Sequence, residues 1–93
     1  MFGVRLQKVR KMLRLSQEDI STQIGISYRA YSSYEREDRK PPIDFLEKLA
    51  TDFNINLNYL IAGIGSEFIP PKYEDVRTEI LAEVEKMLKN RGL

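Results

Sequence analysis

Side chains that can hydrogen-bond a partner are concentrated in one short stretch of the chain. Arg29 is the most informative of them, because a guanidinium can donate two bonds to O6 and N7 of a guanine base. A tyrosine can pack on a thymine methyl or bond to a phosphate, and a serine hydroxyl can meet either a base or a phosphate. The candidate base contacts are Ser27, Tyr28, Arg29, Ser32 and Ser33.

A second group of side chains suits phosphate oxygens. Gln17 falls in the first turn of a predicted helix, where free backbone amides and the helix dipole favour an anion. Three cationic side chains follow the serine-rich stretch, and they are expected to contact the phosphate backbone on the other side of the recognition helix. The candidate phosphate contacts are Gln17, Arg36, Arg39 and Lys40, and such contacts fix register without reading sequence.

Two short helical patterns joined across one glycine must position these groups. Ser16 is predicted to cap the first helix together with Asp19, and Gly25 to end it in a left-handed conformation. Ser27 is predicted to cap the second helix, which ends near residue 35 or 36. This arrangement is typical of a helix-turn-helix. The spacing within the second helix predicts that one group of residues faces the interior: Ala30, Tyr31 and Tyr34. The other group is expected to face outward: Tyr28, Arg29, Ser32 and Ser33.

The remaining sequence predicts an all-α protein. Apolar residues at helical spacing indicate a first helix over about residues 3–13, a fourth beginning at Asp44 and a short fifth over about 57–61. Glycine, serine and a proline pair mark residues 65–71 as a linker. A final helix from residue 72 or 73 to about 90 carries an apolar stripe. We expect a DNA-binding unit over 1–64, the linker over 65–71 and a C-terminal helix over 72–93.

Composition narrows the classes of function. The 93 residues include no cysteine and no histidine, which excludes disulfides, thiolate or imidazole metal sites and histidine-based catalysis. We therefore expect no enzyme activity, no cofactor and no metal. No apolar run reaches the roughly 20 residues of a membrane span, and a cytoplasmic location is expected. The net charge of +1 divides into +4 over residues 1–40 and −3 over residues 41–93, which suits a polyanionic partner for the first half.

The order of these motifs resembles that of a known family. The carrying residues are Leu15-Ser-Gln-Glu-Asp-Ile-x₃-Ile-Gly-Ile-Ser-x₃-Tyr-x₂-Tyr-Glu, then Pro41-Pro-x₂-Phe45-Leu-x₂-Leu-Ala, then Asn58-Tyr-Leu-Ile-Ala-Gly63. Over about residues 3–63 the chain is similar to the Cro/CI-repressor (Xre-type) helix-turn-helix family. The resemblance implies a five-helix lambda-repressor-like domain that binds palindromic operators in double-stranded DNA as a dimer. It also matches Gln17 to a phosphate contact, and the base-reading positions to Ser27, Tyr28, Arg29 and Ser33.

The chain departs from the family pattern at three places. Ser21 stands where alanine is usual and must find a hydrogen bond. Tyr31 and Tyr34 replace aliphatic residues, so wider packing between helices is expected. Arg36-Glu37 replaces the usual Asn-Gly turn, which affects where the basic loop lies against the phosphates.

The C-terminal stripe leaves alternatives open. Its residues either pair with a second copy or fold back on the domain; the candidate dimerisation residues are Val76, Ile80, Val84 and Met87. A dimeric repressor is the favoured interpretation. The alternatives are an antitoxin that also binds a toxin, a protein-interaction module without DNA binding, and the N-terminal part of a longer repressor with a regulatory domain.

Overall fold

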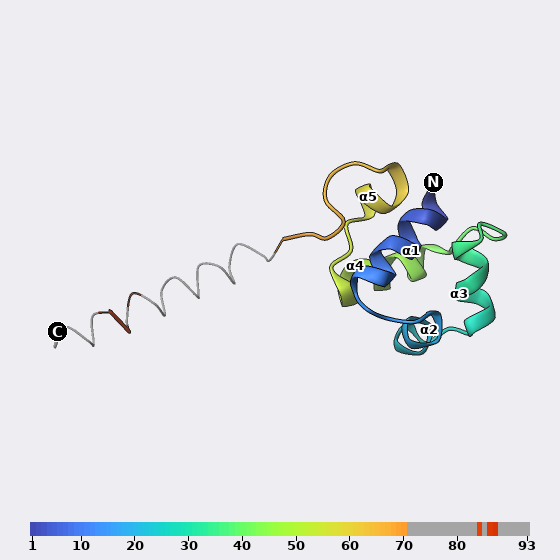
Figure 1. The fold of residues 1–93 in the computed structure, drawn as a ribbon, viewed down its shortest axis with the longest axis horizontal. Coiled ribbons are helices and arrows are strands. Elements are labelled where there is room, and N and C mark those ends of the chain that lie inside the picture. The colour runs from blue at the N-terminus through green and yellow to red at the C-terminus, as the bar shows by residue number, and fades with distance from the viewer. Residues whose placement is uncertain (71–83, 85, 88–93) are drawn as a thin grey trace.

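Five helices form the folded unit in a computed structural model that describes residues 1–70, 84, 86 and 87. They are α1 (Phe2–Met12), α2 (Gln17–Ile24), α3 (Tyr28–Glu35), α4 (Ile43–Phe53) and α5 (Leu57–Ala62), as Figure 1 shows. The all-α prediction with five helices over the first two thirds of the chain is confirmed. No helix among the described residues has the length and apolar character needed to cross a membrane.

Local sequence signals set the ends of α2 and α3. The Ser16 hydroxyl accepts a hydrogen bond from the Asp19 amide at 3.0 Å, and the Asp19 carboxylate accepts one from the Ser16 amide at 3.1 Å. Gly25 ends α2 at φ 89°, a conformation that costs glycine little. The Ser27 hydroxyl accepts from the Ala30 amide at 3.1 Å and starts α3. The predicted caps are therefore confirmed at all three positions.

The core lies where the inner faces of the helices meet. Its members are apolar and buried: Leu6, Val9, Ile20, Ile24, Tyr31, Phe45, Leu49, Ile55 and Leu60. Helix α3 packs against both α1 and α2, while α1 also packs against α5. The approach of α1 to α3 is close, because a Cβ on Gly3 would overlap the backbone carbonyl of Glu35.

Both tyrosines assigned to the interior pack there. The Tyr31 side chain is fully buried, and Tyr34 is partly buried with its ring 4.8 Å from that of Phe45. Ser21, where the family has alanine, donates from its hydroxyl to the Glu18 carbonyl at 2.9 Å. The crowded contact between α2 and α3 thus contains a polar atom that is satisfied within its own helix.

The chain after α5 extends the folded unit beyond the predicted boundary at residue 64. The Asn56 amide donates to the Glu67 carbonyl at 2.9 Å, and the Ile69 amide donates to the Asn54 carbonyl at 2.8 Å. The Glu67 carboxylate also forms an ion pair of 3.0 Å with Lys8 of α1. Most of the stretch expected as a linker is therefore held against the helices. Backbone pairing of this kind leaves no signal in composition.

The predicted C-terminal helix falls mainly outside the described residues. Val76 and Ile80 are among the positions that lie outside them. Val84 and Met87 are described, and their side chains are 46% and 54% exposed. The proposed role of these four residues in dimerisation stays a prediction.

Candidate nucleic-acid interface

The N-terminal half of α3 presents polar side chains to solvent. Tyr28 is 53% exposed, and Arg29 and Ser27 are exposed beside it. Within the described residues the Arg29 guanidinium forms no hydrogen bond and no ion pair. Its donors are therefore available to a ligand, as the sequence prediction requires.

Ser32 and Ser33 do not face outward as expected. They are only 7% and 5% exposed. The Ser33 hydroxyl turns back to donate to the Ala30 carbonyl at 2.6 Å, a bond that short polar side chains commonly make inside helices. The Ser32 hydroxyl accepts from the Arg36 guanidinium at 2.5 Å. The outward prediction is wrong for both residues, because a short side chain can bond to its own helix and be covered by a longer neighbour.

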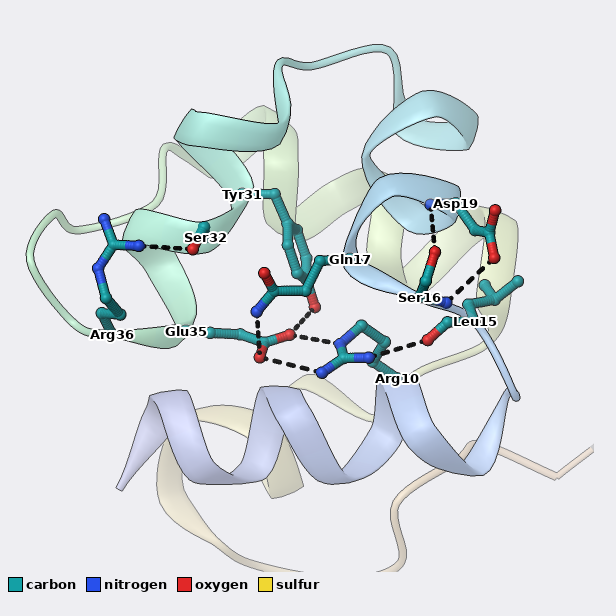
Figure 2. A network of polar contacts seen from close by, with 9 residues as sticks. All are labelled: Arg10, Leu15, Ser16, Gln17, Asp19, Tyr31, Ser32, Glu35 and Arg36. Carbon is teal, nitrogen blue, oxygen red and sulfur yellow. Dashed lines mark hydrogen bonds and ion pairs between the residues drawn. The ribbon is translucent and has the colours of Figure 1, made fainter.

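A buried polar network joins α1, α2 and α3 behind the exposed face (Figure 2). Its centre is the Glu35 carboxylate, which accepts from Arg10 at 2.7 and 3.3 Å, from the Tyr31 hydroxyl at 2.5 Å and from the Gln17 amide at 3.0 Å. Arg10 also donates to the Leu15 carbonyl at 2.9 Å, at the entry to α2. One carboxylate at the end of α3 therefore fixes the other two helices relative to it.

The electrostatics of this network favour the charged pair. The side chains of Arg10 and Glu35 are only 10% and 6% exposed. Burial alone would raise the pKa of Glu35, but hydrogen bonds from Arg10, Tyr31 and Gln17 together outweigh it and lower that pKa. The bond to Glu35 raises the pKa of Arg10, and burial followed by that carboxylate raises the pKa of Tyr31.

Gln17, which was expected to contact a phosphate, also forms a hydrogen bond within the fold. Its amide donates to Glu35, which fixes the orientation of a side chain whose other N–H and carbonyl oxygen remain. Arg10 was missed by the sequence reasoning. A signal was present, because Arg10 lies on the apolar stripe of its helix, four residues after Leu6 and three before Leu13. A charged residue on such a stripe requires a buried partner.

The three cations after α3 differ in their surroundings. Arg36 donates to Asp38 at 2.9 Å in addition to Ser32. Arg39 and Lys40 are exposed and form no ion pair with any described residue. The turn between them and α3 passes through Glu37 at φ 61°, the left-handed conformation for which glycine is usual. No group of potential metal ligands occurs among the described residues.

The fold and the exposed second helix of the motif define a helix-turn-helix DNA-binding domain. Residues 3–66 match the helix-turn-helix domain family. The chain belongs to this family, in its Cro/CI-repressor (Xre-type) branch. The resemblance to this family that the sequence analysis described is therefore confirmed.

Several curated proteins are similar to the chain. The HTH-type transcriptional regulator YobD of Bacillus subtilis is 36% identical over 61 residues, 66% of this chain and 54% of that protein. The regulator YqaE of the same organism is 30% identical over 88 residues, 95% of this chain and 73% of its own length. The cryptic phage CTXphi transcriptional repressor RstR of Vibrio cholerae is 27% identical over 62 residues, 67% and 56% respectively. The chain thus spans about half the length of YobD and RstR, and no solved structure matches it significantly.

Proposed function

We propose that this protein is a transcriptional regulator that binds double-stranded DNA sequence-specifically, with α3 in the major groove. The observation that carries the proposal is the contrast between the two sides of α3. Arg29 projects from its N-terminal half without a partner among the described residues, while Glu35 anchors the opposite side to α1 and α2. A helix held in this way can enter a groove about 12 Å wide without losing its orientation.

Base reading is assigned to the first turns of α3. In helix-turn-helix proteins the N-terminal residues of the second helix contact base edges. Tyr28 and Arg29 are exposed there, and Ser27 lies at the cap. Arg29 is the residue to which we assign discrimination for guanine, worth about 1–3 kcal/mol.

Phosphate contacts are assigned to Gln17 on one side of α3 and to Arg39 and Lys40 on the other. The two cations are exposed and unpaired within the described residues, and Gln17 lies at the start of α2, where the helix dipole favours an anion. These contacts would supply much of the affinity and its salt dependence. The protein would act where the DNA is, in the cytoplasm.

We further propose that the regulator is a dimeric repressor of a palindromic operator. A two-fold symmetric dimer matches two half-sites about one helical turn apart, about 34 Å. The apolar stripe predicted for residues 72–93 would join the copies. Repression, which we attribute to occlusion of a promoter, draws support from the similarity to RstR, which is named a transcriptional repressor.

Competition binding with single-base operator variants tests the assignment of Arg29. After selection of a preferred duplex from a random pool, Arg29→Ala should lose discrimination at one base pair of each half-site. Lys40→Ala should weaken binding to every duplex alike and reduce the salt slope by about one. Equal losses on all variants for Arg29→Ala would remove that residue from base reading. A wild-type protein with no preferred duplex would contradict the proposed function itself.

A further inference from the structure

A second arginine lies on the same side of α3 as Arg29. Arg36 follows Arg29 by seven residues, which is two helical turns less about 20°. Arg36 continues the right-handed helical conformation, with φ −77° and ψ −9°, so it stays in register with α3. Between the two arginines lie Ser32 and Ser33, whose buried hydroxyls are bonded to Arg36 and to the Ala30 carbonyl respectively.

Two hydrogen bonds hold the Arg36 side chain along α3. Its Nη1 donates to Ser32 at 2.5 Å, and its Nε donates to Asp38 at 2.9 Å. Figure 2 shows the guanidinium turned back toward Ser32, apart from the network at Glu35. These bonds leave Nη2 and the second hydrogen of Nη1 without a partner among the described residues. The free end of the guanidinium can therefore still donate two parallel bonds, and the side chain remains 56% exposed.

We propose that Arg36 is a second base-reading residue, oriented by Ser32 and Asp38, and that it recognises a guanine about three base pairs from the one read by Arg29. The inference rests on the proposed function, because it requires α3 to lie in the major groove. Seven residues of helix rise about 10 Å, and three base-pair steps of B-DNA also span about 10 Å. The two serines between the arginines are buried, so they add no exposed bulk to this side of α3.

The surroundings of Arg36 favour a base over the phosphate contact expected from the sequence. A phosphate can be held by a cation in many orientations, as the exposed Arg39 and Lys40 in the following loop would allow. Arg36 instead is held by two hydrogen bonds, and an oriented guanidinium suits bidentate base recognition. Asp38 lies directly beside its guanidinium, and this carboxylate would repel a phosphate brought to the same place.

The test uses the full chain, its selected duplex and every single-base variant of one half-site. Arg36→Ala should lose about 5- to 100-fold of discrimination at one base pair, two to four steps from the pair relaxed by Arg29→Ala. Arg36→Lys keeps the charge but lacks the planar fork, so it should lose the same discrimination. Arg39→Ala is the matched control and should weaken all duplexes equally.

Two positioning variants complete the experiment. Ser32→Ala and Asp38→Asn should relax the same base pair as Arg36→Ala, to a smaller degree, while thermal melting stays unchanged. A uniform loss for Arg36→Ala that Arg36→Lys restores would show a phosphate contact and overturn the inference. In that outcome Arg29→Ala would still relax its own base pair, so the proposed function would stand. A wild-type protein without any sequence preference would overturn both.

Discussion

Arginine and tyrosine have opposite roles on the inner and outer sides of α3, the inner arginine coming from α1. On the inner side Tyr31 is fully buried and its hydroxyl bonds to Glu35, which also holds the buried Arg10. On the outer side Tyr28 is exposed and Arg29 has no partner among the described residues. Arginine and tyrosine therefore hold the helices together on the inner side, and on the outer side they are exposed to solvent. The side of α3 on which a residue lies decides its role, and the residue type alone does not.

This division explains how a helix of eight residues can stay folded while one of its sides remains exposed. An isolated helix of that length is marginal in water, so its stability must come from packing on one side. The carboxylate of Glu35 accepts hydrogen bonds from α1, α2 and α3. Tyr28 and Arg29 on the other side of α3 form no side-chain hydrogen bond among the described residues, so they are not needed to hold the helix in place.

Removal of the Glu35 carboxylate should have the largest effect. Glu35→Ala leaves the Arg10 guanidinium, only 10% exposed, without its partner, so the free energy of unfolding should fall by about 3–5 kcal/mol. Urea denaturation followed by circular dichroism measures this loss. Arg29→Ala on the outer side is the control and should change stability by less than about 0.5 kcal/mol. Equal effects of the two substitutions would break the distinction between the sides.

Acid should reproduce part of the same loss. The pKa of Glu35 is lower in the folded chain than in the unfolded chain, so the unfolded chain binds more protons as the pH falls. The stabilisation is complete above the unfolded pKa, near 4.3, and is lost as the pH falls through the folded value. Glu35→Gln should therefore be less stable at neutral pH and show a shallower decline below about pH 5. Melting temperatures between pH 7 and pH 3 test this.

In Glu35→Gln the loss of stability with falling pH should become shallower without disappearing. Asp19 has a lowered pKa because of the Ser16 amide and then its hydroxyl, and Glu67 because of its own backbone amide and then Lys8. Asp19 is exposed and the Glu67 side chain is 27% exposed, against 6% for Glu35, so each adds less than Glu35. An unchanged acid slope in Glu35→Gln would contradict the assignment of Glu35 as the main acid-sensitive group of the inner side.

The sequence was sufficient for the helices and their caps, because capping and helical periodicity are local. It also placed Tyr31 and Tyr34 inside from spacing alone. It failed for Ser32 and Ser33, since whether a short polar side chain bonds to its own helix depends on rotamer and on a neighbour such as Arg36. The pairing of Asn54 and Asn56 with the chain near Glu67 is a backbone interaction between distant segments, which side-chain pattern does not encode.

The Glu35 network was not predicted because it too joins segments that are distant in the sequence. Arg10, Gln17 and Glu35 come from three helices, and their convergence depends on how those helices cross. Sequence spacing locates each residue on its own helix but gives no distance between helices. Arg10 on an apolar stripe was the one local indication that a buried acceptor must exist.

A pair of matched tyrosine substitutions gives the smallest and most specific test of the comparison. Tyr31→Phe removes the hydroxyl that donates to Glu35 and should cost about 1–2 kcal/mol, because the acceptor is charged but keeps its bonds from Arg10 and Gln17. Tyr28→Phe removes the same atom from an exposed ring and should change stability by less than about 0.5 kcal/mol. Urea midpoints separate the two. Operator binding should show the reverse order, since only Tyr28 lies on the side assigned to DNA. A stability loss for Tyr28→Phe as large as that for Tyr31→Phe would mean that the outer side also holds the fold together.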